Sequence, residues 1–182
     1  VLADNSASPE FIAADLISQA EHDPDSRSIL LTTSLDMAEN VIKDIYNNIE
    51  MLEKKYGSKI NIKVILSSIK KNCRIIFNPG MGWLIGACNM IAPEHLEIMV
   101  KDVKKVLKEI KNAGAIFVGR YCPVAVGDYT AGTNHVIPTN GNARFSSPLG
   151  VYDFLKKSSI TFYSESALKK ERLPDPTKIG NV

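Results

Sequence analysis

The stretch "PEHLEIMVKDVKKVLKEIKNAGAIFVG", residues 93–119, contains the pattern of a strand, a helix and a second strand. "HLEIMV" alternates as a half-buried strand does, and "AIFVG", residues 115–119, is a short apolar run of the kind that forms a buried strand. Between them, Val103, Leu107 and Ile110 fall on one helical face, and the lysines occupy the other. This stretch therefore predicts an α/β fold in which helices pack on a sheet.

The same alternation of strand and helix extends over most of the chain. Ser8 suits a helix N-cap and Pro9 the first helical position, while Ser34 suits the start of a second helix that Gly57 would end. The predicted helices cover residues 8–22, 34–56 and 101–111, and the predicted strands cover residues 28–33, 73–78, 93–100 and 115–119. Residues 58–72 are read as a strand followed by a short helix, residues 80–90 as weakly helical, and residues 151–164 as a helix followed by a strand. The fold class predicted from this order is α/β, a Rossmann-like sheet with helices on both faces.

Composition limits the classes of protein that the chain can belong to. It has 182 residues, of which 45% are hydrophobic and 23% charged, which is typical of one globular, soluble domain. A net charge of +2 is too small to predict a nucleic-acid partner or an acidic membrane surface, and no apolar run approaches membrane-spanning length. The three cysteines, Cys73, Cys88 and Cys122, are odd in number and far apart, which favours reduced thiols inside a cell.

Titratable residues gather at the predicted ends of elements. Glu94 and His95 stand side by side after a proline, and taken alone they could simply be the polar start of a strand. They also have the composition of a general base next to a proton shuttle. Gln19 and His22 are three residues apart, so they share one helical face and can point at one object. The alternative for His22 is a surface position that the helix dipole favours.

Residues 121–150 form a long segment that is rich in glycine and proline and has little periodicity. A loop of this length in a compact domain is usually functional or disordered. It carries Asp128 and His135 between glycines, and carboxylate, imidazole and amide groups supply the oxygen and nitrogen donors that zinc accepts. Either these residues form a mixed metal site, or the aspartate makes a turn that the histidine caps.

Four segments of the chain, taken in order, resemble blocks of histidinol dehydrogenase. They are "ADLISQAEHDPDS", "NMIAPEHLEIMV", "NAGAIFVGRYCPVAVGDYTAGTNHVIPT" and "ARFSSPLGVYDFLKKSS", and they cover most of residues 1–35 and 86–163. The resemblance implies oxidation of L-histidinol to L-histidine through an aldehyde, in two NAD-dependent steps, with one bound zinc ion in each subunit. It also implies a site residue for each task in that reaction.

The resemblance implies that Glu94 is the base that activates water for the second oxidation. His95 would accept the proton of the alcohol and contact the substrate, and His135 would have a supporting role near the site. Three residues are implied as zinc ligands that also hold the substrate: Gln19, His22 and Asp128. The residues that bind NAD are not assigned, because in the family the nucleotide-contacting region lies mainly in a portion that precedes these residues.

The resemblance also implies how the chain is organised. Residues 1–163 would be an α/β portion that binds zinc and substrate, incomplete relative to the full family fold, and residues 164–182 a divergent or truncated tail. The family is a homodimer whose site is shared across subunits, with a fourth zinc ligand from the partner. The chain is expected to be a fragment located in the cytoplasm, or in a plastid if it comes from a plant. Alone it is expected to bind zinc weakly, associate and reduce no NAD. The alternative is a non-catalytic remnant that keeps the fold and binds zinc or a partner.

Overall fold

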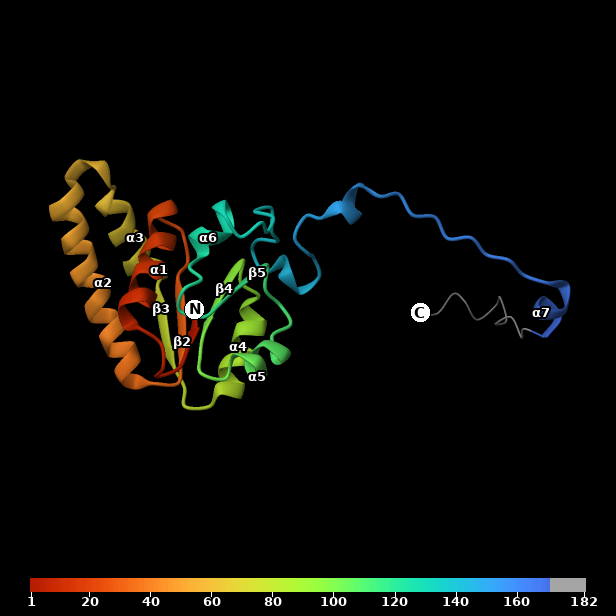
Figure 1. Ribbon diagram of the computed structural model, residues 1–182, viewed down its shortest axis with the longest axis horizontal. Helices are drawn as coiled ribbons and strands as arrows, with labels where there is room; N and C mark the ends of the chain where they lie inside the picture. Colours follow the sequence, from red (N-terminus) through yellow and green to blue (C-terminus); the bar gives the residue numbers. More distant parts are fainter. Residues whose placement is uncertain (171–182) are drawn as a thin grey trace. The chain divides into compact units, whose positions relative to one another are not determined.

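A computed structural model describes residues 1–170 of the chain, and its core is a sheet of five parallel strands (Figure 1). The strands are β1 (Leu2–Ala3), β2 (Ile29–Thr32), β3 (Arg74–Phe77), β4 (His95–Met99) and β5 (Ala115–Val118). Their order in the sheet is β3-β2-β1-β4-β5, and every neighbouring pair is parallel. Leu2 of the central strand pairs with Leu31 on one side and with Ile98 on the other. The predicted Rossmann-like α/β class is confirmed.

Helices cover both faces of this sheet, as predicted (Figure 1). One core cluster joins the sheet to α1 (Pro9–His22), α2 (Leu35–Tyr56) and α3 (Ile62–Asn72). The other joins it to α4 (Met81–Ile91) and α5 (Val103–Glu109). Because successive strand residues point to opposite faces, Leu96 and Ile98 of β4 belong to the second cluster and Met99 to the first. Among the helices of residues 1–170, none is long and apolar enough to cross a bilayer.

The predicted ends of the first two helices are confirmed, each by a local physical cause. Pro9 is the first residue of α1, and Ser8 is its N-cap, although the serine side chain caps no backbone group. Ser34 Oγ accepts a hydrogen bond of 3.2 Å from the backbone N–H of Met37, which satisfies one of the unpaired donors at the start of α2. Gly57 ends α2 with φ of 53°, a left-handed value that favours glycine.

Two segments differ from the expectation. Residues 58–72 contain no strand: a 3₁₀ turn (Gly57–Lys59) leads directly into α3, whose first turn is capped by the Asn61 side chain accepting from Val64 N at 3.3 Å. Ile65 and Ile69, one helical turn apart, then bury one face of α3. The long segment 121–150 is not entirely irregular, because it contains the short helix α6 (Val124–Tyr129) and a 3₁₀ turn (Asn142–Arg144).

The chain divides into two compact units, Val1–Gly150 and Val151–Val182, the second described as far as residue 170. The second unit has a 3₁₀ turn (Val151–Phe154) and a short helix, α7 (Glu165–Lys170). The strand predicted within residues 151–164 is wrong, because residues 155–164 form neither helix nor strand and the apolar Ile160 and Phe162 stay exposed. The predicted frayed end lies outside the described residues, and the division predicted at residue 163 stays a prediction.

Candidate functional site

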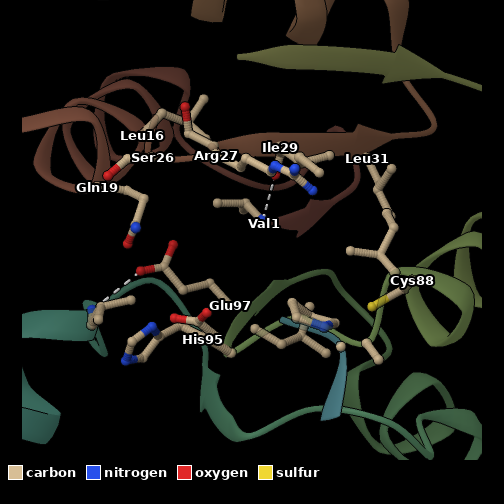
Figure 2. Close-up of a pocket in the computed structure, with 18 of the residues that line it drawn as sticks. Val1, Leu16, Gln19, Ser26, Arg27, Ile29, Leu31, Cys88, His95 and Glu97 are labelled. Carbon is tan, nitrogen blue, oxygen red and sulfur yellow. Dashed lines mark hydrogen bonds between the residues drawn. The ribbon is translucent and has the colours of Figure 1, made fainter. Parts of the chain in front are cut away.

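A cavity of about 810 Å³ lies at the edge of the sheet where the strands begin (Figure 2). Its lining includes Val1, Ile29 and His95, which stand at or next to the first residues of β1, β2 and β4. Ligands of open α/β sheets usually bind at the opposite edge, outside the carboxyl ends of the strands. The cavity therefore does not lie at the edge where such sheets usually bind nucleotides.

Three of the predicted site residues, Gln19, Glu94 and His95, line this cavity together. Gln19 lies near the end of α1, and because α1 runs antiparallel to the strands, its last turn reaches the amino edge. His22 is the last residue of α1 and is exposed, and it does not line the cavity. Asp128 on α6 and His135 beyond it do not line the cavity either, but their charges act on His95.

The Glu94–His95 pair is held by a tight backbone junction between β4 and β5. The Gly114 N–H donates to the Pro93 carbonyl at 2.9 Å, and the Ala115 N–H donates to the Glu94 carbonyl at 2.7 Å. A Cβ atom at residue 114 would lie 2.6 Å from the Glu94 carbonyl oxygen, so only glycine fits there. The Glu94 carboxylate accepts a hydrogen bond of 3.3 Å from the backbone N–H of Asn140. Backbone N–H groups of two segments, residues 114–115 and residue 140, thus fix the position of Glu94.

His95 is half-buried, and its ring lies against the ring of Phe117, with 6.0 Å between the ring centroids. Burial lowers the pKa of His95 below its usual 6.5. The negative charges of Glu94 and Asp128 oppose this lowering, whereas the other two histidines add to it. The net effect favours the neutral imidazole at pH 7. A neutral imidazole can accept a proton, which is what a general base must do.

Asp128 and His135 bind each other. The distance between Asp128 Oδ1 and His135 Nδ1 is 2.5 Å, and both side chains are partly open to solvent. The helix that carries Asp128 packs against β5, because a Cβ atom at Gly127 would lie 2.8 Å from the Phe117 ring. Both alternatives for this loop stay open, since a carboxylate that ligates a metal through one oxygen commonly accepts a hydrogen bond on the other.

The types of donor group among the three predicted ligands suit zinc. Gln19, His22 and Asp128 supply an amide oxygen, an imidazole and a carboxylate, all of which zinc accepts. Within residues 1–170, however, no group of three His, Cys, Asp or Glu side chains lies close enough to hold a metal ion. His22 is exposed, and one oxygen of Asp128 is engaged by His135. The assignment of these three residues as ligands stays a prediction.

Two acidic residues also line the cavity and are not among the site residues predicted from the sequence: Asp15 on α1 and Glu97 on β4. Glu97 is only 3% exposed, and burial, followed by the charge of Asp15, raises the pKa of Glu97 to about 7. Its Oε1 atom accepts a hydrogen bond of 3.2 Å from the backbone N–H of Val124. One feature of the sequence could have indicated Glu97: it lies between two apolar residues of a predicted strand, two positions after His95.

Comparison with known proteins identifies the family. The family model described as histidinol dehydrogenase matches residues 1–173. The chain belongs to the histidinol dehydrogenase family. The matched range includes residues 36–85, which lie outside the four blocks that carry the resemblance in sequence. The resemblance read from those blocks is confirmed.

Individual histidinol dehydrogenases match over nearly all of the chain. That of Caldanaerobacter subterraneus subsp. tengcongensis is 50% identical over 167 residues, which is 92% of this chain and 37% of the relative. That of Bacillus subtilis is 48% identical over 170 residues, 93% of this chain and 38% of the relative. The crystal structure of histidinol dehydrogenase from Elizabethkingia anophelis matches with a TM-score of 0.78 and 34% identity over 92% of this chain and 37% of that one. The chain thus spans well under half of the relatives' length.

Proposed function

We propose that this chain supplies the acid–base site for the NAD-linked oxidation of L-histidinol to L-histidine through histidinal, the last step of histidine biosynthesis. The observation that carries the proposal is the placement of Glu94 and His95 with Gln19 around one cavity. Membership of the histidinol dehydrogenase family supports the choice of substrate. A carboxylate and a neutral imidazole side by side suit two successive oxidations at one carbon, because each oxidation must release a proton.

Each of the two residues has one task in the proposed reaction. In the first oxidation, His95 takes the hydroxyl proton of the alcohol as the carbinol carbon loses a hydride, which leaves the aldehyde. In the second, Glu94 takes a proton from water as the water oxygen bonds to the aldehyde carbon, and loss of a second hydride leaves the carboxylic acid. The contact of the Glu94 carboxylate with the Asn140 N–H orients this base toward the cavity.

The cofactors and the assembly are part of the proposal. NAD is the oxidant in both steps, and no residue of this chain is assigned to it. Zinc, with Gln19, His22 and Asp128 as proposed ligands and substrate contacts, would orient the substrate. No step above depends on the metal, and one oxygen of Asp128 is engaged by His135. The enzyme is proposed to be a homodimer in which the partner subunit completes the site, and to be located in the cytoplasm. Both proposals agree with the organisation that the family resemblance implies.

The proposal is tested with a histidinol dehydrogenase of the relatives' full length that carries this sequence, called the full-length enzyme below. With L-histidinol and NAD it is expected to form two NADH for each histidine. The 182-residue chain alone is expected to form none. A full-length enzyme that oxidises other alcohols but not histidinol would contradict the proposed substrate. NADH formed by the chain alone would place the nucleotide site within these residues.

One observation favours the alternative of a non-catalytic remnant that retains the fold and weak zinc or partner binding. Within residues 1–170 no three His, Cys, Asp or Glu side chains are grouped as a metal site, and Asp128 is bound to His135. The same assay separates the two candidates, because a remnant forms no NADH even in the full-length enzyme. Zinc content, measured by atomic absorption, then decides whether the metal is retained.

A further inference from the structure

Two carboxyl groups that line the cavity lie within hydrogen-bonding reach of each other: the half-buried Asp15 on α1 and the buried Glu97 on β4. Two carboxylates only accept hydrogen bonds, so the contact requires that one of them carries a proton. Without that proton, Oε2 of Glu97 is a buried oxygen with no partner among residues 1–170. Burial raises the pKa of both groups and so favours their protonated forms. One proton shared between the two carboxyl groups therefore satisfies their hydrogen bonding.

The other oxygen of Glu97 holds the start of α6. The N–H of Val124, the first residue of α6, donates to Glu97 Oε1 at 3.2 Å. The first N–H groups of a helix have no partner within the helix, so this bond replaces a missing one. A second contact acts at the same place, because Phe117 is the register partner of Glu97 on β5 and lies under Gly127 of α6.

The pair is placed next to the residues of the proposed site. Glu97 is two positions after His95 on β4, so both side chains point to the same face of the sheet. Asp15 is one helical turn before Gln19 on α1, so these two share a helix face. Figure 2 shows the side chains of Gln19 and Glu97 pointing toward each other in the cavity. The carboxyl pair thus lies on or beside three elements that carry predicted site residues, namely α1, β4 and α6.

We propose that Asp15 and Glu97 act as a positioning pair, which holds α1 and α6 against β4 so that Gln19 and Asp128 stay in place around His95. Glu97 makes both links, one to Asp15 and one to the Val124 N–H, and neither residue takes part in proton transfer with the substrate. The effect on the substrate rests on the proposed function, whereas the effect on α6 does not.

Three variants separate the links. Glu97→Gln keeps an oxygen for the Val124 N–H and brings an amide donor for Asp15, so it preserves both contacts. Glu97→Leu removes both contacts and keeps a side chain of similar length. Val124→Pro removes the N–H donor and leaves both carboxyl groups in place, and proline is well tolerated at the first position of a helix. Ser34→Ala is the matched control, because it also deletes a side-chain acceptor of a backbone N–H, but at the opposite edge of the sheet.

The first measurement is hydrogen–deuterium exchange of the peptide that spans α6 in the full-length enzyme, and it needs no activity. Exchange is expected to become about tenfold faster in Glu97→Leu and Val124→Pro, which is the effect of losing one hydrogen bond. Glu97→Gln and Ser34→Ala should stay within about threefold of the unaltered enzyme by the same measure. Unchanged exchange of α6 in Val124→Pro would overturn the proposal, even if Glu97→Leu fails to fold.

The second measurement is the KM for L-histidinol. Misplaced Gln19 and Asp128 should weaken substrate binding, so KM should rise about tenfold in Glu97→Leu and Val124→Pro and return close to the original value in Glu97→Gln. A merely structural loss, as in Ser34→Ala, lowers the fraction of active molecules and leaves KM unchanged. Faster exchange of α6 with an unchanged KM would refute the positioning role. If the unaltered enzyme does not oxidise histidinol, the proposed function fails, and the exchange measurement still decides whether the pair holds α6.

Discussion

Glu94→Gln is expected to block the oxidation of histidinal to histidine while the oxidation of histidinol to histidinal proceeds at nearly its original rate. Only the second oxidation needs an activated water, and loss of a general base typically costs about 10²- to 10⁴-fold in rate. Glutamine has nearly the same shape and keeps an oxygen that can accept from the Asn140 N–H, as Glu94 does at 3.3 Å. The substitution therefore removes the base and leaves its support in place.

Single-turnover rates of the full-length enzyme with histidinol and with histidinal, each measured separately, test this expectation. Glu10→Gln is the matched control, because it makes the same chemical change at an exposed position in the first turn of α1, away from the cavity. It should leave both rates unchanged. Equal loss of both oxidations in Glu94→Gln would show that Glu94 has another task.

His95→Asn is expected to slow the first oxidation by about 10²- to 10⁴-fold, because the alcohol then lacks its proton acceptor. The pH dependence follows from the position of the ring. Burial lowers the pKa of His95 below 6.5, so its proton-accepting form predominates at neutral pH. The rate of the first oxidation should therefore hold steady as pH falls toward 6.5, and should drop only as pH passes through the lowered pKa.

The pH profile of histidinol oxidation distinguishes this role from a structural one. In the unaltered full-length enzyme the acidic limb should reflect a single group with a pKa below 6.5, and in His95→Asn that limb should be absent from the residual rate. Glu94→Gln should keep it, because that substitution leaves the imidazole in place. An acidic limb that persists in His95→Asn would assign the proton transfer to another residue.

Most of the fold follows from local signals in the sequence. Ser34 and Gly57 define α2 through a side-chain cap and a left-handed backbone angle, both of which depend on the residue type alone. The failures have a different origin. The apolar run within residues 155–164 is typical of a strand, yet a strand forms only where a neighbour pairs with its backbone, and local sequence carries no information about that neighbour.

The site was predictable only in part, for a related reason. Gln19, Glu94 and His95 could be selected because polar groups at the ends of elements tend to line sites, and all three line the cavity. Glu97 was not selected, because a glutamate in an alternating strand is usually assigned to the solvent-facing side. It is buried because α1 and α6 cover that side of β4, and such long-range packing cannot be read from one strand.

The central claim is that substrate binds at the amino edge of the sheet, beside His95. A crystal structure of the full-length enzyme with L-histidinol tests it most directly. The expected result is substrate density in the cavity, with the carbinol oxygen within hydrogen-bonding distance of the His95 ring and the chain of the substrate between Gln19 and Glu94. At the opposite edge, the Asp4 carboxylate already accepts from the Lys101 N–H at 2.8 Å, between the carboxyl ends of β1 and β4. Substrate density there, beside Asp4 and Lys101 and away from His95, would contradict the claim.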